Sequence, residues 1–181
     1  MQIQKFFDGE VILLTPEKFK DSRGFFSETY NQSQYKSLGI NATFIQDNFS
    51  KSIKKFTFRG MHFQKSPMAQ AKLVRVLQGS IIDIIIDIRK GSSTFLESRS
   101  FELSFKKFNQ LYIPEGFAHG FLTTEENTEV AYKVSEYFSP EHDISLLASA
   151  KELNLKLPIS WDKMHFSKKD LAGKSINTIS L

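Results

Sequence analysis

Cysteine is absent from this sequence of 181 residues, which excludes disulfide bonds, thiolate nucleophiles and cysteine-ligated metals. Long apolar runs are absent too. Among the first twenty residues the apolar stretch is confined to 11–14, between Glu10 and Pro16, and it is too short for a signal peptide or a membrane span. We therefore expect a cytoplasmic protein without a membrane segment.

An excess of charge of one sign is also missing. Lysine and arginine outnumber aspartate and glutamate by only 24 to 20, a net charge of +4, and the lysines are scattered. A nucleic-acid partner is therefore not expected, although a few convergent basic residues would suit a small anionic substrate. The length, with no internal repeat and no linker-like stretch, predicts a single domain over residues 1–181.

Helix signals are few and strand signals are many. A helix is expected over 32–38, with Asn31 as its cap and Gly39 as its stop, and a second short helix around 145–153. Short β-rich runs between turn residues predict strands at 25–30, 42–49, 56–64, 72–77, 81–88, 94–104, 110–114 and 128–138. This spacing is typical of an all-β sandwich or barrel, here with a few short peripheral helices.

The run 81–88 has two different faces. Its even-numbered isoleucines lie together on one side of a strand, whereas Asp83 and Asp87 interrupt the isoleucines of the other side. We expect one packed face and one more polar face. The intervening Gln78 and Gly79 predict a turn that joins this run to 72–77 in a β-hairpin.

Two of the four histidines, His62 and His119, lie beside glycines in segments that look like strand ends. A lone strand histidine is more often a hydrogen-bonded core residue than a functional one. His62, however, is accompanied by Arg59, Gln64 and Lys72, and such a density of polar groups in an otherwise apolar barrel indicates a site.

Five ordered motifs cover most of the chain. They are DSRGFFSE at 21–28, QDNFS at 46–50, RGMHFQ at 59–64 followed by Pro67, Gln70 and KLV at 72–74, IPEGFAHGF at 113–121, and YK at 132–133 with YFSPE at 137–141. Together they resemble the dTDP-4-dehydrorhamnose 3,5-epimerase family, whose fold is a cupin-type jelly-roll barrel. The resemblance implies an isomerase that inverts C3, C5 or both in a nucleoside-diphosphate 4-keto-6-deoxyhexose, in deoxysugar biosynthesis for surface polysaccharide.

The chemistry of a 4-keto sugar suits these residues, because the ketone acidifies the hydrogens on both neighbouring carbons. A neutral imidazole removes such a hydrogen when a fixed cation stabilises the enolate oxygen, and no cofactor is then needed. We expect His62 to be the base and Lys72 the cation. The resemblance implies that Tyr132 is the acid on the opposite face of the ring and that Asp170 holds the far nitrogen of His62.

The resemblance also implies substrate-binding positions. They are Arg23, Arg59 and Lys169 for the diphosphate, Glu28, Gln46 and Asn48 with the adjacent Asp47 for the nucleotide end and ribose, Phe138 for stacking on the base, Asp143 where the family has a glutamate, and His119 in the sugar pocket. In the family the segment with Arg23 and Glu28 crosses into the partner's barrel. A homodimer is therefore implied.

Other functions can be weighed against the same residues. The metal ligands of metal-binding cupins follow the pattern His-x-His, then a Glu and a later His. In this sequence Gln64 stands in place of the second His, so no bound metal is expected. The alternatives are a single-carbon epimerase of a CDP or GDP sugar, a cupin sugar 3,4-ketoisomerase and a non-catalytic sugar-binding cupin. The ketoisomerases have a His-x-His pattern that this sequence lacks at 62–64. A non-catalytic sugar-binding cupin would not need Tyr132 opposite His62. After Pro140 the Gly-Ile-x-Trp and Trp-Pro elements of the family are replaced by other residues. The identity of the nucleotide, dTDP, CDP or GDP, is therefore not decided by the resemblance.

Overall fold

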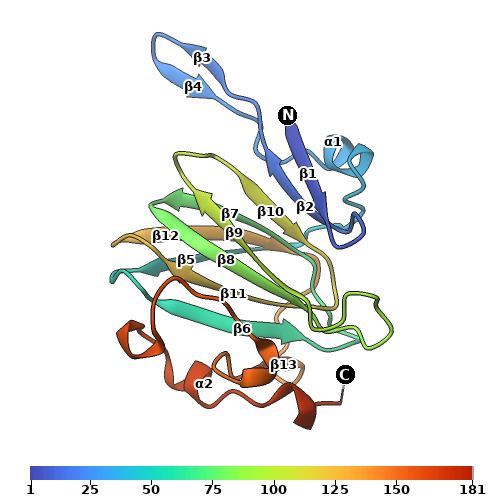
Figure 1. Cartoon of the computed structure of the whole chain (residues 1–181). Helices are drawn as coiled ribbons and strands as arrows, with labels where there is room; N and C mark the ends of the chain where they lie inside the picture. The colour runs from blue at the N-terminus through green and yellow to red at the C-terminus, as the bar shows by residue number, and fades with distance from the viewer. Residues whose placement is uncertain (181) are drawn as a thin grey trace.

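The computed structural model describes residues 1–180 and is built around two antiparallel sheets that face each other (Figure 1). The first sheet, in the order β1-β2-β10-β7-β12-β5, contains β1 (Gln2–Phe6), β2 (Val11–Thr15), β5 (Gln46–Ser52), β7 (Lys72–Gln78), β10 (Gln110–Ile113) and β12 (Thr128–Val134). The second sheet, in the order β13-β6-β11-β8-β9, contains β6 (Phe58–Gln64), β8 (Ser80–Asp87), β9 (Ser98–Ser104), β11 (Phe117–Thr123) and β13 (Asp143–Ser145). The expected all-β architecture is confirmed.

The helices are short and peripheral, as expected. They are α1 (Gln32–Ser37), η1 (Lys151–Leu153), η2 (Trp161–Lys163), α2 (Lys168–Leu171) and η3 (Ile176–Thr178). The predicted first helix is confirmed, because the side chain of Asn31 accepts a hydrogen bond from the backbone of Gln34 at 3.2 Å and Gly39 follows with a φ of +100°. Among residues 1–180, no helix is both long and apolar enough to cross a membrane.

Three apolar layers hold the sheets together. Side chains such as Val74, Ile85 and Phe121 fill the space between the sheets. The outer face of the first sheet is covered by Tyr35 of α1 and its neighbours, and the outer face of the second is covered by the segment after β13, shown in orange and red in Figure 1. Burial of these faces is the main favourable contribution to folding.

The two faces of β8 are both buried, which refines the expected contrast between a packed and a polar face. Ile84 and Ile86 pack beneath the C-terminal segment, while Ile85 faces the other sheet. Asp83 and Asp87 lie inside the fold with no exposed surface. The more polar face is therefore the interior face, where a buried carboxylate must find partners.

The predicted hairpin of 72–77 with 81–88 is wrong. β7 pairs with β10 and β12, whereas β8 pairs with β9 and β11, so the two strands belong to different sheets. Gly79, with a φ of +77° and the side chain of Thr128 against it, turns the chain from one sheet to the other. The turn therefore joins an inner strand of one sheet to an inner strand of the other.

The predicted second helix around 145–153 is also wrong. Residue 145 ends β13, and only η1 at the end of the range is helical. The backbone N–H groups of Leu146 and Leu147 donate instead to the carbonyl oxygens of Met61 and Lys174, at 2.8 and 2.9 Å. These tertiary hydrogen bonds replace the bonds of a helix.

Several strand boundaries differ from the prediction. The strand expected at 25–30 is only β4 (Gly24–Phe26), which pairs with β3 (Phe19–Asp21), and the one expected at 94–104 begins at residue 98. The strand expected at 42–49 is shifted to β5, and that at 128–138 ends at Val134. The strands β1, β2, β3 and β13 were not predicted, and β11 is a full strand where only a strand end was expected. Strand pairing, rather than local composition, decides these limits.

Strands β6 and β11 are in close contact at Gly60 and Gly120. A Cβ atom on Gly60 would lie 2.4 Å from the Cα of Gly120 and 3.0 Å from the carbonyl oxygen of His119, and the φ of Gly60 is +136°. Since His62 on β6 lies opposite His119 on β11, this contact sets the separation of the two histidines. Only glycine fits here.

We predict that Gly60→Ala lowers the free energy of unfolding by about 2 kcal/mol or more, because overpacking and backbone strain add at this position. Urea denaturation of the variant and the wild type measures the difference. Gly91→Ala is the matched control, since no atom lies within 4 Å of a Cβ built there and its φ is not positive. Equal stability of the Gly60 variant and the control would contradict this account of the strand crossing.

Candidate active site

A pocket of about 550 Å³ opens between the two sheets and the C-terminal segment. Eleven of the fourteen residues assigned to a site from the sequence line it: Gln46, Asn48, Arg59, His62, Lys72, His119, Tyr132, Phe138, Asp143, Lys169 and Asp170. Ten of them come from β5, β6, β7, β11, β12, β13 and α2, and Phe138 lies in the connection between β12 and β13. The fold thus gathers, in one concave space, polar groups that are spread over more than a hundred residues of chain.

His62 is paired with a buried carboxylate. Its Nε2 lies 2.7 Å from Oδ1 of Asp170, and their side chains are 30% and 4% exposed. The other oxygen of Asp170 accepts hydrogen bonds from the backbone and hydroxyl of Ser167, which is the N-cap of α2. Burial works against the charge of Asp170, but the bonds from His62 and Ser167 keep its pKa below the ordinary value. An ionised Asp170 fixes the proton of His62 on Nε2 and leaves Nδ1 as the basic nitrogen.

Lys72 supplies a buried positive charge. Its side chain enters the pocket from the start of β7, and its Nζ lies 3.4 Å from the carbonyl oxygen of His62. Burial lowers its pKa to about 8, against the attraction of the carboxylates of Asp83 and Asp143. Lys72 is therefore mostly charged at neutral pH, in a place where water screens the charge little.

A second histidine–carboxylate pair lies beside the first. Nε2 of His119 is 2.9 Å from Oδ2 of Asp83, and both side chains are buried. Burial lowers the pKa of His119 and raises that of Asp83, although the two groups partly offset this for each other. The other oxygen of Asp83 is buried without a hydrogen-bond partner, so its charge is balanced mainly by His119 and the nearby Lys72.

Tyr132 faces the pocket from the wall opposite His62. It belongs to β12 of the first sheet, whereas His62 and His119 belong to the second. Burial raises the pKa of Tyr132, so the phenol keeps its proton at neutral pH. A base and a proton donor therefore face each other across the cavity, with Lys72 on the same wall as Tyr132.

The remaining pocket residues have defined partners. The guanidinium of Arg59 donates to the hydroxyl of Ser52 and the carbonyl oxygen of Lys51, each at 3.0 Å. Lys169 and Asp143 form an ion pair at the entrance. Gln46 and Asn48 are hydrogen-bonded to each other at 2.9 Å, and the ring of Phe138 is 56% exposed.

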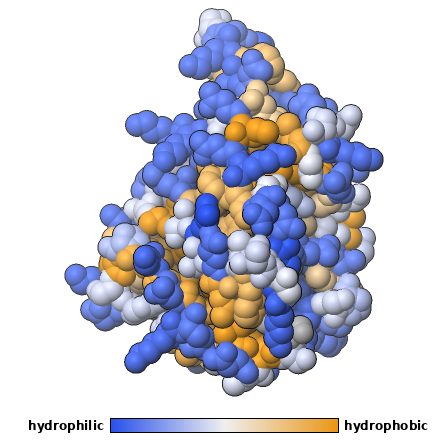
Figure 2. All heavy atoms as spheres, turned by 45° about the vertical axis from the view of Figure 1, so that its right-hand side comes forward, coloured by the Kyte–Doolittle hydropathy of each residue, from blue (hydrophilic) through white to orange (hydrophobic). Residues whose placement is uncertain are grey.

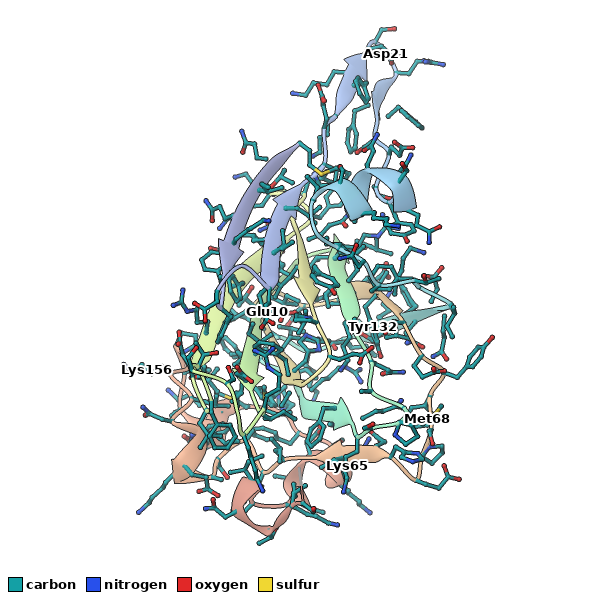
Figure 3. All side chains as sticks on the ribbon, turned by 90° about the vertical axis from the view of Figure 1, so that its right-hand side faces the viewer. Glu10, Asp21, Lys65, Met68, Tyr132 and Lys156 are labelled. Carbon is teal, nitrogen blue, oxygen red and sulfur yellow. The ribbon has the colours of Figure 1, made fainter. Side chains whose placement is uncertain are left out.

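Three predicted substrate-binding residues do not join this pocket. Arg23 lies at the tip of the β3–β4 hairpin, 88% exposed and paired with Asp21, whose label in Figure 3 is well away from that of Tyr132 in the barrel. Glu28 instead accepts hydrogen bonds from Asn31 and Gln34 near α1.

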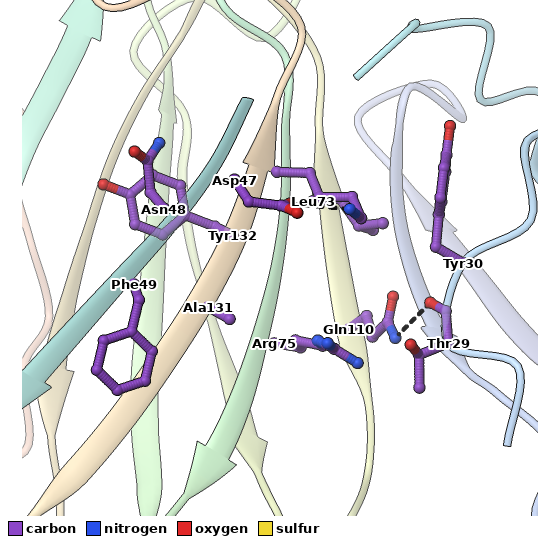
Figure 4. Close-up of a pocket in the computed structure, with 11 residues that line it drawn as sticks. Thr29, Tyr30, Asp47, Asn48, Phe49, Leu73, Arg75, Gln110, Ala131 and Tyr132 are labelled. Atoms are coloured by element: carbon purple, nitrogen blue, oxygen red, sulfur yellow. Dashed lines mark hydrogen bonds and ion pairs between the residues drawn. The ribbon is translucent and has the colours of Figure 1, made fainter. Parts of the chain in front are cut away.

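Asp47 is the third residue outside the pocket. Successive residues of a strand point to opposite faces, so Gln46 and Asn48 face the pocket and Asp47 faces outward. There it pairs with Lys133 at 2.8 Å and lines a separate hollow of about 220 Å³, shown in Figure 4.

The structure adds residues that the sequence analysis did not assign. Asp83 and Ser167 orient His119 and Asp170, and Gln64 and Gln70 line the pocket. A signal for Asp83 was present in the interrupted isoleucine run, and Ser167 stands three residues before Asp170, the spacing of a helix cap. Within residues 1–180, no three His, Asp or Glu side chains are grouped so as to hold a metal. Metal independence stays a prediction.

Comparisons with known proteins bear on this geometry. The family model for dTDP-4-dehydrorhamnose 3,5-epimerase matches residues 9–178. A dTDP-4-dehydrorhamnose 3,5-epimerase of Salmonella typhimurium is 45% identical over 165 residues, which are 91% of this chain and 89% of that protein.

The chain belongs to the dTDP-4-dehydrorhamnose 3,5-epimerase family.

Solved structures of the family agree with the fold. The epimerase of Bacillus anthracis str. Ames, with TDP and PPi bound, is 43% identical and superposes with a TM-score of 0.92 over 96% of this chain and 98% of its own. An epimerase of Legionella pneumophila in complex with dTDP-4-keto-L-rhamnose is 38% identical with a TM-score of 0.92, over 99% and 94% of the two chains. The predicted cupin-type jelly-roll fold and the predicted isomerase family are confirmed.

We predict a signature of Lys72 in the pH dependence of stability. Its pKa is about 8 in the fold and 10.5 in the ordinary state, so between these values the unfolded chain binds more protons and folding gains stability as pH rises. The difference in unfolding free energy between wild type and Lys72→Met should be constant below pH 7. Between pH 8 and 10 it should grow in favour of the wild type, by up to about 3 kcal/mol.

Urea denaturation at stepped pH measures this difference. Lys156→Met, at an exposed lysine, is the control for the loss of one positive charge. A difference that does not change with pH would show that Lys72 titrates alike in both states and is not a buried cation.

Proposed function

We propose that this chain epimerises C3, C5 or both of a nucleoside-diphosphate 4-keto-6-deoxyhexose, with conversion of dTDP-4-dehydro-6-deoxyglucose to dTDP-4-dehydrorhamnose as the preferred reaction. The observation that carries the proposal is the position of His62 and Tyr132 on opposite walls of one pocket, with the buried cation of Lys72 beside them. Inversion of a carbon requires a base on one face of the sugar ring and an acid on the other.

Proton removal is the first step. Nδ1 of His62 takes a hydrogen from a carbon next to the ketone, while Asp170 holds Nε2–H and stabilises the imidazolium that forms. The electron pair moves onto the ketone oxygen, and the ammonium of Lys72 stabilises this enolate. His119, which Asp83 fixes in orientation, lies close enough to Lys72 to contact the same part of the sugar.

Proton return completes the inversion. The phenol of Tyr132 donates a proton to the same carbon from the opposite face, and the enolate collapses back to the ketone. Because burial raises the pKa of Tyr132, the phenol is protonated when it is needed. The imidazolium of His62 then releases its proton to solvent and the phenolate of Tyr132 takes one up, so the cycle needs no redox partner.

The nucleotide end is proposed to lie toward the rim. Arg59 and Lys169 line the pocket and suit the oxygens of a diphosphate, and the exposed ring of Phe138 suits stacking on a base. Support comes from the related epimerases, which hold TDP with PPi in one case and dTDP-4-keto-L-rhamnose in the other.

We further propose that the chain is a single domain that works as a homodimer. The β3–β4 hairpin projects from the barrel in Figure 1, and its Phe19 and Phe26 are 56% and 70% exposed. Apolar atoms are visible on this hairpin at the top of Figure 2. On the barrel, Phe49 of the edge strand β5 is 59% exposed. Such exposed aromatics are typical of an interface, and a second copy would cover them and bring Arg23 and Glu28 to its site.

Exchange in heavy water separates the two proton-transfer roles. His62→Asn should lose both deuterium wash-in and inversion of dTDP-4-keto-6-deoxyglucose by roughly a hundred- to ten-thousand-fold, because no enolate forms. Tyr132→Phe should retain wash-in, since the enolate still forms and is reprotonated on the His62 side, while inversion falls sharply. Mass spectrometry counts the deuterium and NMR identifies the product. Inversion by Tyr132→Phe at the wild-type rate would assign the acid to another group.

Mixed dimers test the contribution of the hairpin. Arg23→Ala and His62→Ala homodimers should both be impaired, but random mixing gives heterodimers with one complete site. Activity should then recover to about a quarter of the wild-type value. If mixing restores nothing, although native mass spectrometry shows that heterodimers have formed, the site is built within one chain.

A further inference from the structure

Residues 136–139 form a short strap at the rim of the pocket, between the end of β12 and β13. Phe138 belongs to this strap, and its exposed ring lines the pocket. The strap is not part of either sheet, although the strand pattern of the sequence continues into it. Its backbone must therefore find hydrogen-bond partners elsewhere.

Glutamine side chains supply those partners at every residue of the strap. Gln70 donates to the carbonyl oxygen of Glu136 at 2.8 Å, and Gln64 donates to that of Tyr137 at 3.1 Å. The N–H of Phe138 donates to Gln46 at 3.2 Å, and the N–H of Ser139 donates to Gln64 at 2.8 Å. Three amides from β5, β6 and the loop after β6 thus hold four consecutive residues.

Gln64 is the central member of this set. It lies two residues after His62 on the same face of β6 and is 5% exposed. Its amide nitrogen donates to Met68 and Tyr137, and its oxygen accepts from Ser139, so both donors are used. A side chain that faces the pocket is therefore committed to the backbone of the rim rather than left free for a ligand. Met68 and Lys65, labelled in Figure 3, mark the loop that the same amide holds.

We propose that Gln64, with Gln70 and Gln46, is a positioning residue that fixes Phe138 where its ring binds the base of the nucleotide. This assignment rests on the proposed function, because it needs a substrate with a planar base at the rim. A preorganised ring binds the base without first being ordered, so loss of the glutamine contacts weakens binding without removing the ring itself. Proton transfer at His62 depends on Asp170, Lys72 and Tyr132 rather than on Gln64.

The variant Gln64→Met keeps the size of the side chain and removes its hydrogen bonds. We expect the Kd of dTDP, measured by titration calorimetry, and the KM of the nucleotide sugar to rise about tenfold, within the range for loss of a base–aromatic contact. The loss should appear in KM rather than in kcat. Gln70→Met removes only the hydrogen bond to the carbonyl oxygen of Glu136, so the Kd and KM should rise less. This variant provides the test if Gln64→Met does not fold.

A double-mutant cycle with Phe138→Ala decides between positioning and general support of the fold. If Gln64 acts through Phe138, Gln64→Met should weaken dTDP binding less than about twofold further in the Phe138→Ala background. Equal effects of Gln64→Met in both backgrounds, or a fall in kcat at unchanged KM, would overturn the assignment.

Asn109→Leu is the matched control. Asn109 is a buried amide that likewise holds backbone, at Ser104 and Glu102, but it lies outside the pocket. Asn109→Leu should lower the melting temperature and leave the Kd of dTDP unchanged. A Kd that rises as much as in Gln64→Met would show that the effect is one of stability and would overturn the assignment.

Binding by the wild type separates the two proposals. If the wild type binds none of dTDP, CDP and GDP, the proposed function and the positioning role both fail. If it binds one of them and Gln64→Met binds equally well, only the positioning role fails.

Discussion

The hydrogen bond between His62 and Asp170 is the interaction on which the site depends. It joins residues 108 positions apart, one on β6 and the other in α2. Asp170 cannot reach His62 unless the segment after β13 packs on the outer face of the second sheet, where Phe166 and Met164 lie against Phe58. The same carboxylate also completes the cap of α2 with Ser167. Docking of the C-terminal segment, capping of its helix and orientation of the imidazole are therefore one cooperative event.

Buried charge is the cost that accompanies this arrangement. Lys72, Asp83, His119 and Asp170 are all nearly inaccessible to water, and burial disfavours the charged form of each. Pairing reduces that cost, with His119 against Asp83 and His62 against Asp170. A low-dielectric pocket also strengthens the field of Lys72 at any developing oxyanion, which water would weaken. The groups that destabilise the fold are thus the groups that suit enolate chemistry.

The rim and the hairpin show how irregular backbone is used in this fold. After Val134, where sheet pairing stops, glutamine side chains form hydrogen bonds with the backbone of residues 136–139. Phe138, in this segment, lines the pocket with its side chain largely exposed. The β3–β4 hairpin is different, because its aromatic side chains are exposed on an element that makes few contacts with its own barrel. The strap is thus fixed within the chain, whereas the hairpin leaves Phe19 and Phe26 exposed, which is the observation behind the proposed dimer.

Local sequence was sufficient for the all-β class and for the first helix with its Asn31 cap, because strand alternation and capping act over a few residues. Most of the pocket residues were predicted from the resemblance of the motifs to a known family rather than from local patterns. Local sequence was not sufficient for the partner of β7, for the fate of 145–153 or for the direction of Asp47, since each depends on which distant strand supplies a hydrogen bond or which face is covered. Asp83 is the clearest case. Its break in the isoleucine pattern was visible, but only the packing of β8 against β11 turns that carboxylate inward to His119, where its burial sets the electrostatics of the site.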